Sequence, residues 1–427
     1  MIYNVIRTAW AHRGVRIVVA VFLALLGVWL RLRSLPHEGY FYDLKVISSW
    51  GRIISLFGWT DVYRHQLSGL SAANYPPGNL AIMGAVVRIH DALGGSLQPG
   101  GAFLNALMKL PACLADAWLA LILFAVVRKF ASIRTAVTAG LLYWLNPGVW
   151  LLSAVWGQTD GIYTALSFTG LIACMVGFPF LAGLMIALSL FVKIQSIILA
   201  PVSALLLLRR PKDIAPFLAG ALPVLLLFLP FVFADRFADI VWVYTKAPGL
   251  PEYVSFNAFN FWWGAFSAWS PYIPDTGRIF GIVSYRMVGY CVIIMSYVLI
   301  LHRLYYSLSS VSDVRRRTHA ALAAAVLCNL VFFFFMTRMQ QRYTMVFFPC
   351  AIILGLLVPH GRRHLIFLFV SFFMNTVFVM FPYELGLNAL IQGRIGWVLA
   401  WINLFVAADL AAVWWKTVLR PDRSVAT

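Results

Sequence analysis

Charged residues are scarce in this 427-residue sequence, at 11% of positions, whereas hydrophobic residues make up 62% and the mean hydropathy is +0.85. About a quarter of the residues of a typical soluble domain are charged, so water is not the main solvent of this chain. Alternating strands of the kind that a membrane barrel needs are not visible. The apolar runs are mostly about 14 to 23 residues long, which is typical of membrane-spanning helices. The sequence therefore predicts an all-α polytopic membrane protein.

The sequence also lacks a long soluble domain, a repeat with a short period and a low-complexity segment. Its five cysteines are scattered without the spacing of metal ligands, which favours packing roles over disulfides or a metal site. No small-residue cleavage site follows the first apolar run, Val18 to Leu30, so we interpret this run as a retained anchor. We expect residues 1–427 to form a single transmembrane domain.

Acidic residues are fewer than basic ones, 15 against 33, which gives a formal net charge of +18. In a soluble protein this excess would suggest a nucleic-acid partner, but here the basic residues recur in clusters between apolar runs. We therefore predict no nucleic-acid partner and interpret the clusters as cytoplasmic loops, with both termini on that side. The clusters lie at 7–16, 128–134, 209–212, 303–317, 362–363 and 416–423.

This orientation predicts twelve crossings, an even number, with two long outer stretches at 34–103 and 235–279. The expected crossings are 17–33, 104–127, 136–153, 161–177, 179–193, 195–208, 216–234, 280–301, 319–336, 345–358, 365–381 and 396–415. We interpret 76–93 as an interfacial helix, because Arg88, His90 and Asp91 interrupt it. A rival topology makes it a crossing and merges 179–208 into one bent helix.

Several polar residues lie where a membrane would exclude them, since a charge at the centre of a membrane helix costs about 2.5–3.5 kcal/mol. In the first outer stretch, Asp43 and Trp50 are seven residues apart and share one face of a helix. Asp43 is then either a functional acid or an N-cap. Lys109 and Asp116 have the same spacing, and we expect a structural ion pair between them. Lys193 and Gln195 form a polar break between half-length helices, which is typical of a helix that lines a cavity.

The later polar residues also leave alternatives open. Trp156, Gln158 and Asp160 suit either a solvated turn or a site for a polyhydroxyl ligand, and Asn257 with Trp262 suits interfacial anchoring or sugar stacking. Two arginines in one outer turn are an exception to the positive-inside rule. They either snorkel or bind a phosphate, to which Lys193 could add a point charge. The turn contains Arg338, Gln340, Arg342 and Tyr343.

In this order the residues resemble the GT-C superfamily of membrane glycosyltransferases. Within it they are similar to the dolichyl-phosphate-glucose-dependent glucosyltransferases of N-glycan assembly and to bacterial mannosyltransferase-like relatives. The shared pattern consists of Asp43 and Trp50, Tyr75-Pro76-Pro77, Lys109 and Asp116, Trp156-Gly157-Gln158 with Asp160, Lys193 and Gln195, Asn257 with Trp262, and Arg342-Tyr343. One departure is Gln340-Gln341, where relatives commonly carry His-Glu.

The resemblance implies a GT-C-like bundle of about 12 transmembrane helices with interfacial helices in the first outer loop. It also implies Asp43 as the catalytic acid, a polyprenyl-phosphate-linked sugar donor drawn from the membrane lipids, and an active site on the non-cytoplasmic side. Related oligosaccharyltransferases use a divalent metal. The outer acids here are too sparse for an oxygen cage, so we expect no metal and no cofactor.

The chemistry of such a donor suits an inverting transfer of a hexose or pentose to a hydroxyl of a glycan, glycolipid or lipid-linked acceptor. Asp43 would be the general base, and Arg342 with Arg338 or Lys193 would bind the phosphate. The rivals are a flippase of lipid-linked saccharide, and a glycan polymerase or ligase with a diphosphate-linked donor. Short loops favour a bacterial or archaeal cell membrane.

Overall fold

The computed structural model describes residues 13–95, 101–247, 252–382, 385–386 and 389–420, and most of this chain is helical. Parts of both terminal basic clusters and short pieces of the two outer stretches lie outside the described residues. The first half contains α2 (Arg13–Ser34), α3 (Phe41–Phe57), α4 (Pro77–Ala92), α5 (Ala102–Phe130), α6 (Ile133–Trp144), α7 (Pro147–Trp150), the π-helical turn η1 (Leu151–Trp156), α8 (Asp160–Val176), α9 (Pro179–Val192), the 3-10 turn η2 (Ile194–Leu199) and α10 (Ala200–Leu208).

The second half continues from a short turn, η3 (Pro211–Asp213), and includes a two-stranded antiparallel hairpin. It contains α11 (Ile214–Leu226), α12 (Leu229–Phe233), α13 (Phe237–Thr245), α14 (Phe261–Phe266), η5 (Ser267–Trp269), β1 (Arg278–Ile279), β2 (Val283–Ser284), α15 (Tyr285–Ser310), α16 (Val314–Phe335), η6 (Gln341–Val346), α17 (Phe347–Leu357), α18 (Arg362–Met380) and α19 (Ala389–Thr417). The predicted all-α architecture is confirmed.

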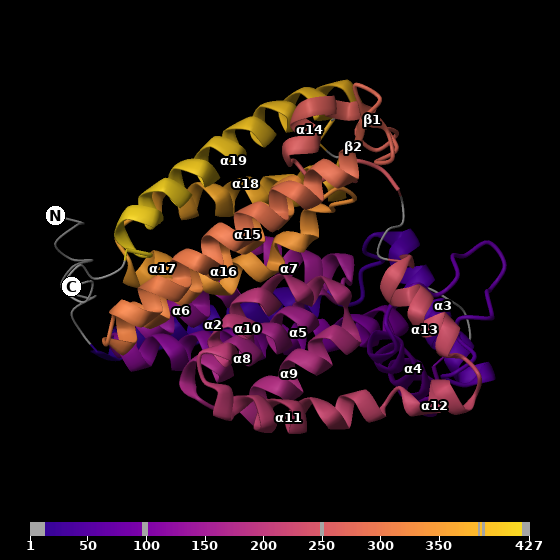
Figure 1. The fold of residues 1–427 in the computed structure, drawn as a ribbon. Helices are drawn as coiled ribbons and strands as arrows, with labels where there is room; N and C mark the ends of the chain where they lie inside the picture. The colour runs from indigo at the N-terminus through magenta and orange to yellow at the C-terminus, as the bar shows by residue number, and fades with distance from the viewer. Residues whose placement is uncertain (1–12, 96–100, 248–251, 383–384, 387–388, 421–427) are drawn as a thin grey trace.

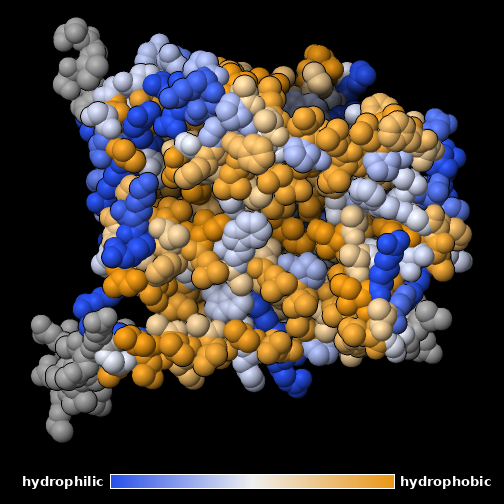
Figure 2. Space-filling model, turned by 90° about the horizontal axis from the view of Figure 1, so that it is seen from below, coloured by the Kyte–Doolittle hydropathy of each residue, from blue (hydrophilic) through white to orange (hydrophobic). Residues whose placement is uncertain are grey.

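Six of the described helices are long and apolar enough to cross a membrane. A seventh is obtained if residues Ile194–Leu208 and Pro211–Leu226, bent by 117°, count as one span. Each of the twelve expected crossings coincides with a helix or a broken helix, while the number of crossings itself stays a prediction. Figure 2 shows a broad apolar face with hydrophilic residues gathered toward its two ends, as expected of a protein surrounded by lipid.

The direction of the helices sorts their ends into two groups. The helices α8, α9 and α10 run in alternating directions, so that residues 160 and 193 lie at one end of the bundle and residues 176 and 208 at the other. In the same way α15 leaves the β1–β2 hairpin and α16 returns toward it. In Figure 1 the hairpin, α3, α4 and α13 gather at one end of the bundle, which we call the loop end. The basic turns after α10 and α15 lie at the opposite end.

Two contacts between helices shape the bundle, one at the loop end and one along α9. Helices α3 and α4 form a hairpin around Trp50, Ile54 and Met83, so the segment 76–93 is helical as predicted. Helices α9 and α11 cross through two glycines. A Cβ at Gly183 would collide with a carbonyl oxygen of α11, and a Cβ at Gly220 with one of α9. The two backbones therefore touch, which is the packing that small residues permit between membrane helices.

The expected ion pair between Lys109 and Asp116 is not formed, although both side chains are fully buried. Asp116 instead pairs with Arg31 at 3.0 Å and accepts a hydrogen bond from Ser153 at 2.6 Å. The Lys109 Nζ donates to the carbonyl oxygen of His37 at 2.5 Å. Seven helical residues span about 10 Å along the axis, which is too far for the direct pair. Asp116 thus joins α5 to α2 through Arg31, and Lys109 joins α5 to the segment after α2 through the carbonyl oxygen of His37.

Candidate active site

A cavity of about 260 Å³ lies at the loop end. Its walls come from α3, residues 71–76, the break between α9 and η2, the end of α13 and the turn 340–343. Segments from five parts of the sequence therefore meet in one place. Eight of the residues predicted from the sequence line it, namely Asp43, Trp50, Tyr75, Lys193, Gln195, Gln340, Arg342 and Tyr343.

Asp43 lies in the first turn of α3, and its carboxylate is held from the side of α8. Its Oδ2 accepts hydrogen bonds from Trp156 Nε1 at 3.0 Å and from Gln158 Nε2 at 2.8 Å. The Arg342 guanidinium lies 3.6 Å from the same oxygen. The alternative that Asp43 caps the helix is wrong, because the N-cap residue is Tyr40. All three contacts use Oδ2, and 27% of the side chain is exposed, so part of the carboxylate is open to the cavity that Asp43 lines.

The segment that donates to Asp43 has an irregular backbone. The turn η1 ends at Trp156, and Gly157 follows with φ = 89°. This left-handed conformation suits glycine and places the side chains on both sides of it toward Asp43. A Cβ at Gly157 would also press on Leu44 and Lys109. Gln158 is only 1% exposed, so the alternative of a solvated turn is wrong.

Two cations share the buried carboxylate of Asp160, which is 0% exposed. The Lys193 Nζ lies 2.9 Å from Asp160 Oδ2, and the Arg342 Nε lies 3.8 Å from it. Lys193 is the C-cap residue of α9, at the predicted break, and its extended backbone turns the side chain toward α8. Arg342 thus bridges Asp160 and Asp43, so that two carboxylates and two cations form one network beside the cavity.

Aromatic rings enclose this network. The rings of Trp50 and Tyr75 meet edge to face at 5.2 Å, and Trp50 Nε1 donates to the carbonyl oxygen of Ser71. The Lys193 ammonium lies 5.1 Å from the ring of Tyr75 and 5.6 Å from that of Tyr343. Burial raises the pKa of Tyr75 to about 12, although Arg342 opposes the shift. Tyr75 is therefore protonated at neutral pH and can act as a hydrogen-bond donor.

Six residues predicted to bind substrate do not line the cavity. Trp156, Gln158 and Asp160 lie behind it, in contact with Asp43 or Lys193, whereas the other three are engaged elsewhere. Arg338 pairs with Asp275 at 2.5 Å and with Glu252 at 3.4 Å, so its charge is already balanced in the second outer stretch. Trp262 is 2% exposed and donates to the carbonyl oxygen of Phe335. The carbonyl oxygen of Asn257 accepts from Asn375. These contacts tie the outer stretch to the helix bundle.

Sequence reasoning missed the part of the wall that α13 provides. Val243 and Ala247 line the cavity, and the ion pair of Arg236 with Asp61 at 2.7 Å joins the start of α13 to the first outer stretch. No local signal could have shown this pair, because 175 positions separate its partners. Ser71 and Asn74 also line the cavity. Asn74 directly precedes Tyr75 and Ser71 lies four residues before it, so closeness in sequence to a predicted residue was the signal that could have found them.

The donor set of the cavity does not favour a divalent metal. In the described part of the chain no three side chains of His, Cys, Asp or Glu are grouped as metal ligands. Each of the two carboxylates, Asp43 and Asp160, already faces a cation of the protein. The arrangement instead offers one accessible carboxylate, two cations near it and aromatic walls.

The helices and this cavity define a multi-pass α-helical membrane protein with a polar cavity at one end of the bundle. The chain is similar to a solved structure, the crystal structure of ArnT from Cupriavidus metallidurans in the apo state. The TM-score is 0.51 at 13% sequence identity, and the likeness covers 97% of this chain and 78% of that one. It confirms the predicted GT-C-like fold, and at this identity it concerns the fold alone.

The sequence itself gives no further assignment. No protein-family model matches the chain, and no curated protein matches it.

Proposed function

We propose that this protein is an inverting glycosyltransferase. It would move a hexose or pentose from a polyprenyl-monophosphate carrier to a hydroxyl of a glycan, glycolipid or lipid-linked acceptor. The observation that carries the proposal is the single cavity in which an accessible carboxylate, Asp43, lies beside two cations, Lys193 and Arg342, within aromatic walls. The GT-C-like fold supports it.

The cations suit the leaving group. As the bond between the anomeric carbon and the phosphate oxygen breaks, that oxygen keeps the electron pair, and the charge of the phosphate rises from −1 to −2. Fixed positive charge near the departing oxygen stabilises this change more than it stabilises the bound donor. Arg342 and Lys193 are positioned for this task. Arg338 is not, because it is paired with acids outside the cavity.

The carboxylate suits the attacking group. The acceptor hydroxyl oxygen forms the new bond to the anomeric carbon while its proton passes to Asp43 Oδ1. Trp156 and Gln158 hold the other oxygen and thereby orient the carboxylate. A single displacement inverts the anomeric centre. A retaining route would need a second carboxylate as nucleophile, and the candidate, Asp160, is fully buried and paired with Lys193.

The distribution of charge supports one orientation of the protein in the membrane. The basic turns lie at the end opposite to the cavity, so by the positive-inside rule the cavity belongs on the non-cytoplasmic side. We propose the cell membrane of a bacterium or archaeon as its location. The prenyl tail of the donor would then lie among the helices, in the lipid.

The test is a transfer assay with purified protein, a labelled polyprenyl-monophosphate sugar and a mixture of candidate acceptors. Asp43→Asn should lose at least about 10²-fold in transfer rate, within the usual range for general-base catalysis, while still binding the carrier. The matched control is Asp235→Asn, because Asp235 is an exposed acid outside the cavity.

The outcomes separate the proposal from its rivals. Glycosidic product formed by wild type and by Asp235→Asn, but not by Asp43→Asn, supports it. Movement of intact lipid-linked saccharide across a vesicle membrane without glycosidic product would instead identify a flippase. Product formed only from a diphosphate-linked donor would indicate a polymerase or ligase. Near-normal turnover of folded Asp43→Asn contradicts the role of Asp43.

A further inference from the structure

We propose that a second pocket, at the end of the bundle opposite to the cavity, binds the phosphate of an anionic phospholipid headgroup. The pocket is formed around three arginines, Arg209, Arg210 and Arg317, which we call the arginine pocket. Its role is independent of the reaction proposed above, because it concerns the other end of the helices and a different ligand.

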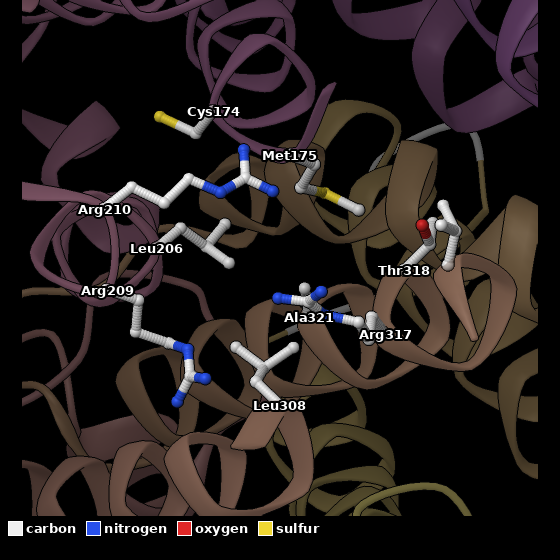
Figure 3. A pocket seen from close by; sticks show the side chains of 10 residues that line it. Cys174, Met175, Leu206, Arg209, Arg210, Leu308, Arg317, Thr318 and Ala321 are labelled. Atoms are coloured by element: carbon white, nitrogen blue, oxygen red, sulfur yellow. The ribbon is translucent and has the colours of Figure 1, made fainter. Parts of the chain in front are cut away.

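The arginine pocket lies where four helices end or begin. Arg209 and Arg210 directly follow α10, Arg317 lies in the first turn of α16, and the ends of α8 and α15 complete the walls. Figure 3 shows Arg210 and Arg317 extending into the pocket, with Arg209 along its edge beside Leu308. The cavity measures about 70 Å³, several times the roughly 10–15 Å³ that one water needs. One phosphate group with its water can therefore be held between the guanidinium groups.

The three charges have no counter-ion among the described residues. Within the described chain no carboxylate forms an ion pair with Arg209, Arg210 or Arg317, although Asp213 and Asp313 lie nearby in the sequence. Asp313 is used as the N-cap of α16, accepting from backbone N–H groups. Like charges held together repel, so this arrangement favours the uptake of an anion.

The hydrogen-bonding capacity of the arginines is also incompletely used. Arg209 donates through one nitrogen to Ser309 at 2.6 Å and to the carbonyl oxygen of Tyr305 at 3.1 Å, while its Nε is buried without a partner. No hydrogen bond from the Arg210 or Arg317 side chain to another described residue occurs. Several N–H donors thus remain for a phosphate, which guanidinium groups bind in a bidentate way.

The positive-inside rule does not explain this arrangement. That rule accounts for arginines in cytoplasmic loops, and it is satisfied by Arg315, which is exposed. Arg317, two residues later, is half-buried and turns into the pocket instead. The difference in exposure between Arg315 and Arg317 indicates that the position of Arg317 serves the pocket and not only the orientation of the protein in the membrane.

A lipid fits the surroundings better than a free anion does. Apolar side chains also line the pocket, among them Leu206, Leu308 and Met175, together with Val314, which is 58% exposed. A free phosphate would leave this apolar surface unused. A phospholipid would place its headgroup on the arginines and its acyl chains along the helices.

The experiment measures lipid binding to the full-length protein in neutral detergent by native mass spectrometry, with phosphatidylglycerol and phosphatidylcholine as probes. Wild type should bind phosphatidylglycerol at least about tenfold more tightly than it binds phosphatidylcholine. Arg317→Gln should lose about tenfold of that affinity, whereas Arg315→Gln, which removes the same charge two residues away, should lose little. Without added lipid, the melting temperature of Arg317→Gln should equal or exceed that of wild type, because repulsion is relieved.

Three results would overturn the proposal. One is an equal loss of phosphatidylglycerol binding in Arg315→Gln and Arg317→Gln, which would mean diffuse surface attraction. Another is equal stabilisation of wild type by inorganic phosphate and by phosphatidylglycerol at the same concentration, which would mean a free anion. The third is unchanged binding in Arg317→Gln. If Arg317→Gln does not fold, Arg210→Gln provides the same comparison.

Discussion

The buried pair of Lys193 and Asp160 allows a quantitative test of the polar network. Its atoms are 2.9 Å apart, and the side chains are 2% and 0% exposed. Removal of one partner from a buried pair costs about 3–5 kcal/mol, because a charge is left in an apolar place without compensation. Lys193→Met and Asp160→Asn should therefore both lower the free energy of unfolding by amounts of this order.

Arg342 makes the two single losses unequal. It lies 3.8 Å from Asp160, a separation at which unit charges attract by about 4 kcal/mol at an effective dielectric constant near 20. Lys193→Met leaves Asp160 with Arg342, so its cost should be near 3 kcal/mol. Asp160→Asn leaves two cations with Asp43 as their one carboxylate, so its cost should be near 5 kcal/mol. The double variant keeps the balanced pair of Arg342 and Asp43.

The double-mutant cycle is measured by reversible unfolding in mixed micelles. The double variant should be more stable than the sum of the single losses predicts, by about 2–3 kcal/mol. Additivity within about 0.5 kcal/mol would refute the reasoning. Sugar transfer separates structure from catalysis, because a double variant that regains stability without activity shows that the pair is needed for transfer as well as for folding. If transfer returns along with stability, Lys193 has only a structural role.

Three further predictions concern the cavity. Trp156→Phe should lower the turnover number about tenfold, because Asp43 loses a hydrogen bond to a charged group. Trp262→Phe, which also loses one indole hydrogen bond, should lose similar stability but keep its activity. Gln340→His should lower KM for the donor at about pH 5.5 and not at about pH 8, since free histidine has a pKa of about 6.5. A shift in KM at both pH values contradicts this. Transfer should also survive a chelator, and loss of activity that Mg²⁺ or Mn²⁺ restores would contradict metal independence.

Much of the fold could be predicted because its determinants are local. Runs of apolar residues specify helices in a membrane whatever their neighbours are, so the boundaries of α8, α9 and α16 followed from the sequence. The break at Lys193 was predictable for the same reason, since a charge inside an apolar run requires a special environment. Asp43 and Trp50 share a face because helical geometry alone places them there.

The rest depends on contacts between distant segments. Spacing suggested that Asp116 pairs with Lys109, but in the structure Asp116 pairs with Arg31 of another helix. Charge alone suggested that Arg338 binds phosphate, yet Asp275 neutralises it from 63 positions away. A sequence shows which buried polar groups need a partner, but it does not show which distant residue the fold brings into contact with each of them. The sequence therefore predicts the kinds of side chain that line the cavity, but only some of the particular residues.

The crossing of α9 and α11 at Gly183 and Gly220 has a consequence for the range of substrates. Because these backbones already touch, α9 cannot move closer to α11, and the Lys193 at its end is held by its buried pair with Asp160. On the opposite wall, α13 is attached to the first outer stretch by two partly exposed pairs, Arg236 with Asp61 and Arg64 with Asp239, and such pairs contribute about 0–1 kcal/mol each. One hydrogen bond, from the Tyr244 hydroxyl to the carbonyl oxygen of Leu190, joins α13 to α9. The adaptable wall is thus the one formed by α13. We expect related proteins to keep one phosphate site while they diverge in the sugar or acceptor that they accept.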